Sequence, residues 1–283
     1  STPKPSSAAS DVYKRQSIYN ITMTAVPHEY IVKHFKPEER LAQLFQTSHL
    51  DALQRKLLRL VSFLAETSNI SLNSFGVTGS ILIDIHRPEF SDIDITVYGV
   101  NNSLAVKNTL TEAYSSSSSM VQRFKEKTLE AWCENKAQKH PLTLSEALQI
   151  YKRKWNIGLF ENTRFSIHPV KLENELTEQY GDKTYHPLSS VTIRAVVHEN
   201  VDCMFLPAVY RVREVKVVEG SSAVDIEEVV SYESLYDNLA EVGETIIVRG
   251  KLERVLDKKS DREYHRVLVG SPEGKGMEYI KLI

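Results

Sequence analysis

Hydrophobic residues recur with two different periods along the chain. Between residues 49 and 67 the apolar positions follow helical spacing, which predicts a helix that buries one stripe. That stripe consists of Leu53, Leu57, Leu60, Val61 and Leu64. The same spacing predicts further helices over 36–45, 103–114, 121–137 and 143–155. Alternating and β-branched runs predict strands over 74–79, 92–99, 163–170, 191–199 and 209–219.

The pattern changes after residue 207. Short β-branched runs, separated by glycines and charged turns, occupy 224–232, 244–257, 263–270 and 278–283. Regular short strands of this kind predict a small barrel or sandwich. We therefore expect an α+β fold, with a mixed sheet flanked by helices over 17–207 and a small all-β, barrel-like domain over 208–283.

Residues 1–16 differ from both regions. The stretch "STPKPSSAASDVYKRQ" is polar, and "DVYKRQ" resembles the translation of a transposase end sequence used in preparing DNA sequencing libraries. We therefore expect a disordered assembly scar in place of the native N-terminus, and we exclude it from the fold.

Composition narrows the class of protein. With 41% hydrophobic and 25% charged residues, the sequence is typical of a globular protein. The formal charge of −2 gives no basic excess, so contact with nucleic acid would need a local patch. The two cysteines, Cys133 and Cys203, lie far apart, which argues against structural zinc and favours a reducing, cytoplasmic setting. No apolar run approaches the roughly 18 residues needed to span a bilayer, so we expect no membrane partner.

The stretch "FGVTGSILIDIHRPEFSDIDITVYG", residues 75–99, carries the candidate chemistry. Gly79 and Ser80 separate a short strand from a helix predicted over 80–86. Glycine lets the backbone approach a ligand closely, and the free N–H groups at the start of a helix attract anions. The pair therefore predicts a phosphate site, although a Gly-Ser alone is also an ordinary turn.

Two carboxylates follow in the next predicted strand. Asp92 and Asp94 share one face, because side chains alternate along a strand. Carboxylates this close repel each other unless a cation neutralises them, and Mg²⁺ prefers carboxylate oxygens together with phosphates and water. An isolated pair of this kind is more often surface charge. Beside the predicted phosphate site, Asp92 and Asp94 are candidate ligands of Mg²⁺ or Mn²⁺.

The combination of Gly79-Ser80 with an apolar-flanked Asp92-x-Asp94 resembles the nucleotidyltransferase superfamily typified by DNA polymerase beta. Residues 30–283 are also similar to an uncharacterised, chiefly archaeal group of predicted nucleotidyltransferases. The resemblance implies a nucleotidyltransferase-like sheet and transfer of a nucleoside monophosphate from a nucleoside triphosphate to a hydroxyl acceptor. RNA, a small molecule or a protein side chain would supply that hydroxyl. The resemblance implies Asp92 and Asp94 as catalytic metal ligands.

Two further residues are candidates for contact with the nucleotide. Ser91 gives the "SDID" form that is frequent in minimal members of the superfamily. Arg87, in the loop before the acid pair, could contact a triphosphate, although surface loops often carry an arginine.

The superfamily pattern includes a third carboxylate on a later strand, and this chain departs from it there. The predicted strand "TRFSIHPV" places Ser166 at the expected position. Serine is a poor ligand for Mg²⁺ and a poor base, whereas His168 could accept a proton near neutral pH. A lone histidine on a strand is more often structural. Five other acids lack the spacing for this role: Glu161, Glu173, Glu175, Glu199 and Asp202.

Other functions remain open at this point. The chain could be a degenerate, non-catalytic module that binds a nucleotide or RNA, or an interaction protein whose C-terminal domain recruits a partner. The stretch "YKRKW", residues 151–155, joins cations with aromatics that could hold phosphates and stack bases. It is also typical of the solvated end of an amphipathic helix.

Overall fold

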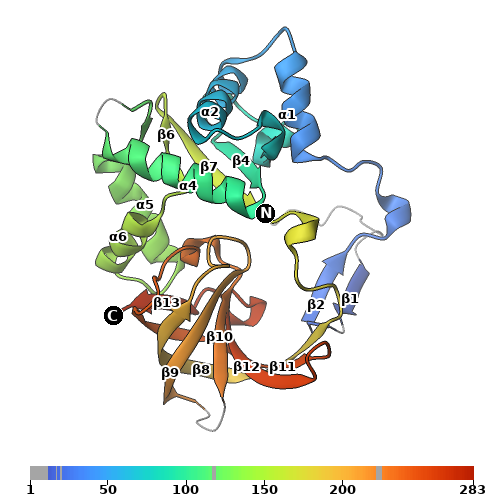
Figure 1. Ribbon diagram of the computed structural model, residues 1–283, viewed down its shortest axis with the longest axis vertical. Helices are drawn as coiled ribbons and strands as arrows, with labels where there is room; N and C mark the ends of the chain where they lie inside the picture. Colours follow the sequence, from blue (N-terminus) through green and yellow to red (C-terminus); the bar gives the residue numbers. More distant parts are fainter. Residues whose placement is uncertain (1–11, 17, 20, 117–118, 221–224) are drawn as a thin grey trace, which may run out of the picture.

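The computed structural model describes residues 12–16, 18–19, 21–116, 119–220 and 225–283. It is an α+β structure with two mixed sheets and flanking helices, as expected from the sequence. In Figure 1 the first sheet and its helices occupy the upper half of the molecule, and the second sheet occupies the lower half.

The first sheet has five strands in the order β3-β4-β7-β6-β5. Their bounds are β3 Phe75–Val77, β4 Ile93–Tyr98, β5 Val121–Gln122, β6 Ile157–Phe160 and β7 Thr163–Val170. β4 and β7 pair in parallel, and the other neighbours are antiparallel. The predicted strand over 163–170 is confirmed. The parallel pairing brings residues about 70 positions apart in sequence side by side.

The helix predicted over 121–137 is wrong in its first turn. Val121 and Gln122 form β5, and helix α5 begins only at Glu126. The reason is tertiary: Val121 is fully buried and pairs with Phe160 of β6. The backbone N–H of Phe124 then donates to the Tyr151 hydroxyl at 2.6 Å. These contacts hold the segment extended against its local helical pattern.

Six α-helices lie among the described residues. They are α1 Pro37–Gln46, α2 Ala52–Ser68, α3 Gly79–Leu82, α4 Val100–Ser115, α5 Glu126–Lys139 and α6 Leu144–Arg153. α2 begins with a capping box, in which the Asp51 side chain accepts from the Gln54 backbone and the Gln54 side chain accepts from the Asp51 backbone. It ends at Asn69, which adopts the left-handed conformation with φ 53°.

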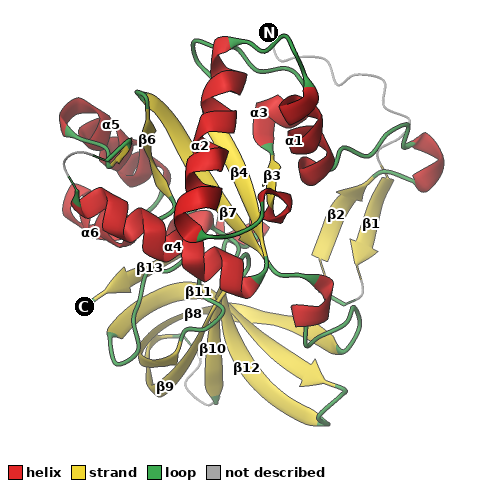
Figure 2. Ribbon diagram, turned by 45° about the horizontal axis from the view of Figure 1, so that its top comes forward, coloured by secondary structure: helices red, strands yellow, loops and turns green. Residues whose placement is uncertain are grey.

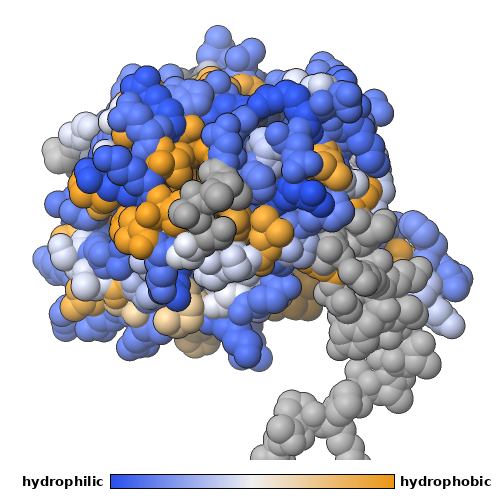
Figure 3. All heavy atoms as spheres, turned by 90° about the horizontal axis from the view of Figure 1, so that it is seen from below, coloured by the Kyte–Doolittle hydropathy of each residue, from blue (hydrophilic) through white to orange (hydrophobic). Residues whose placement is uncertain are grey.

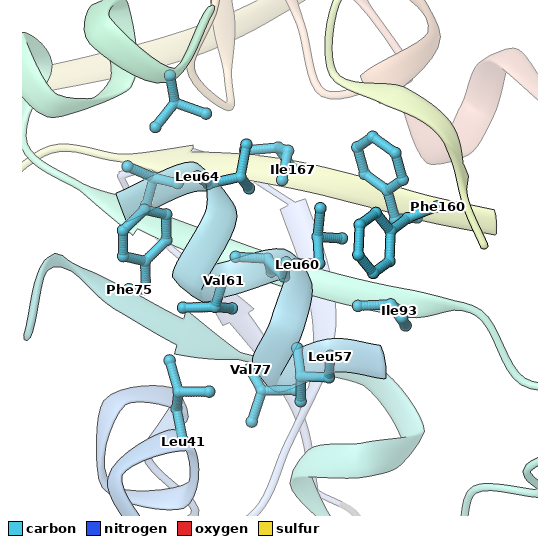
Figure 4. Close-up of a cluster of buried hydrophobic side chains, with 14 of the residues drawn as sticks. Leu41, Leu57, Leu60, Val61, Leu64, Phe75, Val77, Ile93, Phe160 and Ile167 are labelled. Carbon is cyan, nitrogen blue, oxygen red and sulfur yellow. The ribbon is translucent and has the colours of Figure 1, made fainter. Parts of the chain in front are cut away.

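The apolar stripe of α2 is buried as predicted. Leu57, Leu60, Val61 and Leu64 are each 0% exposed and belong to the core between α2 and the first sheet. Figure 4 shows these side chains facing Phe75, Val77, Ile93 and Ile167 from the strands. Burial of a leucine side chain contributes about 1.5–3 kcal/mol, so this stripe is the main attachment of α2 to the strands.

The second sheet has six strands in the order β12-β10-β9-β8-β11-β13 (Figure 2). Their bounds are β8 Lys183–Glu199, β9 Ala208–Glu219, β10 Ile226–Ser231, β11 Thr245–Asp257, β12 Arg262–Val269 and β13 Tyr279–Leu282. β12 also pairs with β11, so the pairings β12-β10-β9-β8-β11-β12 form a closed ring.

The second sheet begins earlier in the sequence than expected. β8, which starts at Lys183, pairs with both β9 and β11, although the predicted boundary lies at residue 208. The strand predicted over 191–199 is thus confirmed, but it belongs to the second sheet. The division of the chain into domains at 208 stays a prediction.

The N-terminal segment lies partly outside the described residues. The expectation of a disordered scar covers residues 1–16, and residues 1–11 of these are not described. β1 Val12–Gln16 pairs antiparallel with β2 Ile21–Ala25, and this ladder of backbone hydrogen bonds differs from the disorder expected there.

Among the described residues, no helix has both the length and the apolar character needed to cross a membrane. Figure 3 shows the lower face of the molecule, where hydrophobic side chains lie among hydrophilic ones.

Candidate functional site

Gly79 lies directly against the carboxylate of Asp94. β3 and β4 pair up to Val77 opposite Ile95, and the Thr78 N–H then donates to the Asp94 carbonyl at 2.9 Å. Gly79 has φ +64°, a conformation that favours glycine. A Cβ at this position would lie 2.4 Å from Asp94 Oδ2. The turn and the acid pair, separated in sequence, therefore form one site.

The helix after Gly79 is shorter than predicted. α3 spans only Gly79–Leu82, whereas the sequence pattern predicts a helix over 80–86. The Ser80 carbonyl accepts from the Ile85 N–H at 3.0 Å, and Asp84 adopts φ 59°, so the chain leaves the helix there. A single turn has little dipole. Any phosphate at this turn would thus depend on the individual backbone N–H groups of Gly79 and Ser80.

The two carboxylates have different surroundings. Asp92 precedes β4 and is exposed, and Asp94 lies within β4 with its side chain 32% exposed. Partial burial raises the pKa of Asp92, the charge of Arg164 opposes that rise, and the charge of Asp94 adds to it. His168 lowers the pKa of Asp94 most strongly; burial opposes this effect and the Ser166 hydrogen bond supports it. Asp94 is therefore the more stable anion of the two.

These pKa shifts predict the order in which the two carboxylates are protonated as the pH falls. Asp92, whose pKa is raised, is protonated before Asp94 as the pH falls. Replacement of Arg164 by glutamine removes the cation that holds the pKa of Asp92 down, so the Asp92 midpoint should move to higher pH. Carboxyl ¹³C NMR titration measures this midpoint. Arg254→Gln, on β11, is the matched control and should leave it unchanged; an unchanged or lower midpoint in Arg164→Gln would contradict the assignment.

Ser166 stands opposite Asp94 on the neighbouring strand. The parallel register of β4 and β7 pairs Asp94 with Ser166 and Thr96 with His168. The Ser166 hydroxyl donates to Asp94 Oδ1 at 2.5 Å, and His168 Nε2 lies 2.7 Å from the same hydroxyl oxygen. His168 Nε2 is 3.8 Å from Asp94 Oδ1, which is too far for a direct hydrogen bond. His168 therefore reaches Asp94 through Ser166, and adds a charge interaction only when both ring nitrogens carry a proton.

The hydrogen-bond directions in this chain restrict the role of His168. Serine has one hydroxyl hydrogen, and here it points to Asp94. Nε2 of His168 must then donate to the Ser166 oxygen, which requires a proton on that nitrogen. In this arrangement His168 is a donor that orients Ser166 and Asp94, and it could act as a base only after the proton moves.

Four of the five other acids considered for the third position are engaged elsewhere. Glu161 pairs with Arg59 at 2.5 Å, Glu199 with Arg211 at 3.3 Å, and Asp202 with Lys171 at 2.5 Å. Glu175 accepts from the Val100 N–H at 3.0 Å, and Glu173 lies in the same short 3-10 turn. Over the described part of the chain, no cluster of three His, Cys, Asp or Glu side chains could hold a metal ion. The protein itself thus offers two carboxylates to a cation.

That donor set fits a Mg²⁺ ion bound together with a nucleotide. Mg²⁺ in nucleotide sites usually takes one or two protein carboxylates, and substrate phosphates and water complete its shell. Asp92 and Asp94 are the residues that would hold it. Asp94 already uses Oδ1 to accept from Ser166, whereas Oδ2, beside Gly79, accepts no hydrogen bond from the described residues.

Ser91 and Arg87 close the loop that precedes the acid pair. The Arg87 N–H donates to Ser91 Oγ at 2.9 Å, and the Ser91 N–H donates to the Arg87 carbonyl at 2.8 Å. The Ser91 hydroxyl oxygen therefore serves this turn, while the Arg87 side chain is exposed. The structure explains why the loop is compact, and contact of either residue with a nucleotide stays a prediction.

The sequence analysis missed the anchor of the same loop. His86 Nε2 lies 2.6 Å from Asp51 Oδ2, and the His86 side chain is only 5% exposed. The other oxygen of Asp51 caps α2. Arg40 of α1 also holds the loop, because it donates to the Ile81 carbonyl at 3.2 Å and to Asp84 at 2.8 Å. The spacing of Asp51 and Gln54 in the sequence is typical of a helix cap and could have revealed it. The contact of Asp51 with His86 could not be recognised from sequence spacing.

The "YKRKW" stretch is mostly interior. Tyr151, Lys154 and Trp155 are each 3% exposed, and Arg153 pairs with Glu244 at 2.5 Å. The suggestion that its aromatics stack bases is therefore wrong, since both rings are packed in the protein. Lys152 is the exposed cation of the stretch.

Comparison with known proteins identifies a relative in an archaeon. No protein-family model matches the chain, and no solved structure matches it. The chain is 32% identical over 266 residues to the uncharacterized protein MJ1086 of Methanocaldococcus jannaschii. The alignment covers 93% of this chain and 74% of that protein. The chain therefore belongs to the same family as MJ1086 of Methanocaldococcus jannaschii.

Proposed function

We propose that this protein is a magnesium-dependent nucleotidyltransferase that moves a nucleoside monophosphate from a nucleoside triphosphate to a hydroxyl acceptor. The observation that carries the proposal is the contact between Gly79 and Asp94, where a Cβ would lie 2.4 Å from the carboxylate. This contact explains why glycine is needed here, and it brings the backbone N–H groups of the turn beside a candidate metal ligand, where a phosphate bound to the cation would meet them.

The fold is consistent with this proposal. The antiparallel β3–β4 pair carries the turn and the acids, and the parallel β4–β7 pair supplies the neighbouring strand. We propose that this sheet is nucleotidyltransferase-like. The closed ring of pairings in the second sheet supports a barrel-like C-terminal domain.

Each residue of the site has a proposed task. Asp92 and Asp94 hold the cation, which when bound would polarise the α-phosphate and the attacking hydroxyl. The backbone of Gly79 and Ser80 receives phosphate oxygens. Ser166 fixes Asp94 by its hydrogen bond at 2.5 Å, and His168 orients Ser166. His168 is therefore a positioning residue in this proposal.

Label transfer tests this function. The wild-type protein, given each α-³²P nucleoside triphosphate with Mg²⁺ and RNA, protein or small-molecule acceptors, should transfer label and release pyrophosphate. Asp92→Asn combined with Asp94→Asn should lower the rate at least about 1,000-fold, because the cation loses both ligands. Lack of transfer by the wild type with all four nucleotides would contradict the proposal.

The second candidate is a non-catalytic nucleotide- or RNA-binding module with the same fold. Ser166 favours it, because a serine stands opposite Asp94 where the superfamily pattern has an acid. This candidate predicts Mg²⁺-dependent nucleotide binding without pyrophosphate release, so the same assay separates the two.

A further inference from the structure

Two cations lie directly opposite each other on the outer face of the second sheet. Arg194 of β8 is the cross-strand partner of Lys216 of β9, and both side chains are exposed. The neighbours Ile193 and Ala195 are buried, so the alternation of β8 directs Arg194 outward. Like charges in direct opposition destabilise a sheet. An anionic ligand across the pair would remove that repulsion.

The acids on the same strands are engaged with other cations. Glu199 pairs with Arg211 at 3.3 Å, and Glu219 pairs with Arg249 at 3.4 Å. Glu214 lies 3.7 Å from Arg213. Within the described ranges, neither Arg194 nor Lys216 makes an ion pair. Their charge is therefore available to a ligand.

The pair belongs to a registered row across four strands. Lys281 of β13 lies opposite Ile247 of β11, which lies opposite Arg194, which lies opposite Lys216. With strands about 4.8 Å apart, this row is about 14 Å long. In the next row Tyr279 lies opposite Arg249. Lys281 pairs with Glu146 at 3.0 Å, and its Nζ lies 4.7 Å from the centre of the Tyr279 ring. Arg194 and Lys216 therefore carry the charge of this row that has no ion-pair partner among the described residues.

A groove continues the surface toward α6. It has a volume of about 550 Å³, and its lining includes Lys152, Thr245 and the ion pair between Arg153 and Glu244. Lys152 is exposed and, in the described part of the chain, has no ion-pair partner. Thr245 lies opposite Val196, two residues from Arg194 on β8. Thr245 shares a face of β11 with Ile247, so the groove begins one step along the strands from Arg194 and Lys216. We call the pair Arg194 and Lys216, together with Lys152 of the groove, the basic row.

We propose that the basic row binds single-stranded RNA. Adjacent unpaired cations suit the phosphates of a nucleic-acid chain, and the apolar Ile247 beside them suits an unpaired base. Glu214 and Glu219 lie on the same strand as Lys216, and each has one carboxylate oxygen outside its ion pair with Arg213 or Arg249. These oxygens can accept hydrogen bonds from ribose 2′-hydroxyls, which DNA lacks. The site is separate from the Asp92–Asp94 pair, so the inference does not depend on catalysis.

Fluorescence anisotropy of the full chain with a 5′-fluorescein-labelled 12-mer of uridine tests this inference, without nucleotide or Mg²⁺ and in 0.1 M KCl. Arg194→Gln combined with Lys216→Gln should weaken binding roughly 25-fold, because two phosphate contacts are lost. The plot of log K against log salt should become less steep by about 1.4. The control is Arg254→Gln with Arg262→Gln, which makes the same change in net charge at cations paired with Glu263 and Glu227. It should change affinity less than twofold.

Four results would overturn the proposal. The first is that the wild-type protein does not bind the RNA, and the second is that both double variants weaken binding equally. The third is that the protein binds the deoxy 12-mer as tightly as the RNA. The fourth is that the wild type binds phosphatidylserine vesicles, and that the Arg194→Gln, Lys216→Gln variant loses vesicle binding but keeps RNA binding. Because the assay contains no nucleotide or metal, none of these results bears on the proposed transferase activity.

Discussion

Replacement of Gly79 by alanine is expected to lower nucleotide transfer at least about 100-fold while the protein stays folded, because displacement of a positioning group by about 1 Å can cost that much in rate. The added methyl group would lie 2.4 Å from Asp94 Oδ2, so either the turn or the carboxylate must move. The residue must also keep φ +64°, which costs an alanine about 1–2 kcal/mol of stability.

The matched control for this variant is Gly181→Ala. Gly181 also has a positive φ, +100°, but a Cβ there would meet only Ile18 Cδ1, at 3.8 Å. The control should show a similar strain without loss of transfer. Steady-state rates, with circular dichroism to verify folding, measure both variants. Full activity in Gly79→Ala would show that Asp94 tolerates displacement and would contradict its assigned role.

Replacement of Lys154 by methionine is expected to lower the free energy of unfolding by about 3–5 kcal/mol, as removal of one partner of a buried ion pair typically does. Lys154 follows α6. Its Nζ contacts Asp237 and the Ser234 carbonyl, which both lie in the segment that connects β10 with β11 of the second sheet. The two side chains are 4% and 6% exposed. Without Lys154, Asp237 keeps a hydrogen bond from Asn156 at 3.3 Å but lies buried without a counter-charge.

Urea denaturation measures this effect, and an exposed pair provides the control. Arg254 lies 3.7 Å from Glu263 with side chains 43% and 49% exposed, so Arg254→Met should cost less than about 1 kcal/mol. A loss of similar size in both variants would contradict the larger cost assigned to breaking the buried Lys154–Asp237 pair. The double variant Lys154→Met, Asp237→Leu should recover part of the loss, because no charge then remains buried.

Local patterns predicted the parts of the fold that depend on local sequence. The stripe of α2 and the alternation of β7 were correct, because each element buries one face that the sequence displays at the right period. The proximity of Gly79 to Asp94 also followed, since the chain returns through residues 78–92 and β4 pairs antiparallel with β3. These features need no information about distant segments.

Features that depend on distant segments could not be predicted. Val121 is in a strand because Phe160 lies beside it, and Lys154 is buried because Asp237 receives its charge. His86 reads as an ordinary loop residue until Asp51 is placed next to it. The basic row likewise depends on register, because Arg194 and Lys216 are opposite each other only after β8 and β9 pair.

The residue that faces Asp94 was predicted from the local sequence, but its role depends on the pairing of distant strands. The sequence placed Ser166 at the position of the expected third acid, and the parallel register sets it opposite Asp94. The hydrogen bonds add what spacing could not give: the hydroxyl hydrogen goes to Asp94, so His168 is a donor to Ser166. On residue type alone, His168 would be assigned as a general base.

Isothermal titration calorimetry with a non-hydrolysable nucleoside triphosphate analogue tests the proposed nucleotide site most directly, because it requires no knowledge of the acceptor. The wild-type protein should bind the analogue in Mg²⁺ and lose at least about tenfold in affinity in EDTA, since the acid pair alone repels the triphosphate. Asp92→Asn with Asp94→Asn should abolish the Mg²⁺ dependence. Binding that is equal in Mg²⁺ and EDTA, or equal in wild type and the double variant, would contradict a nucleotide site built on Asp92 and Asp94.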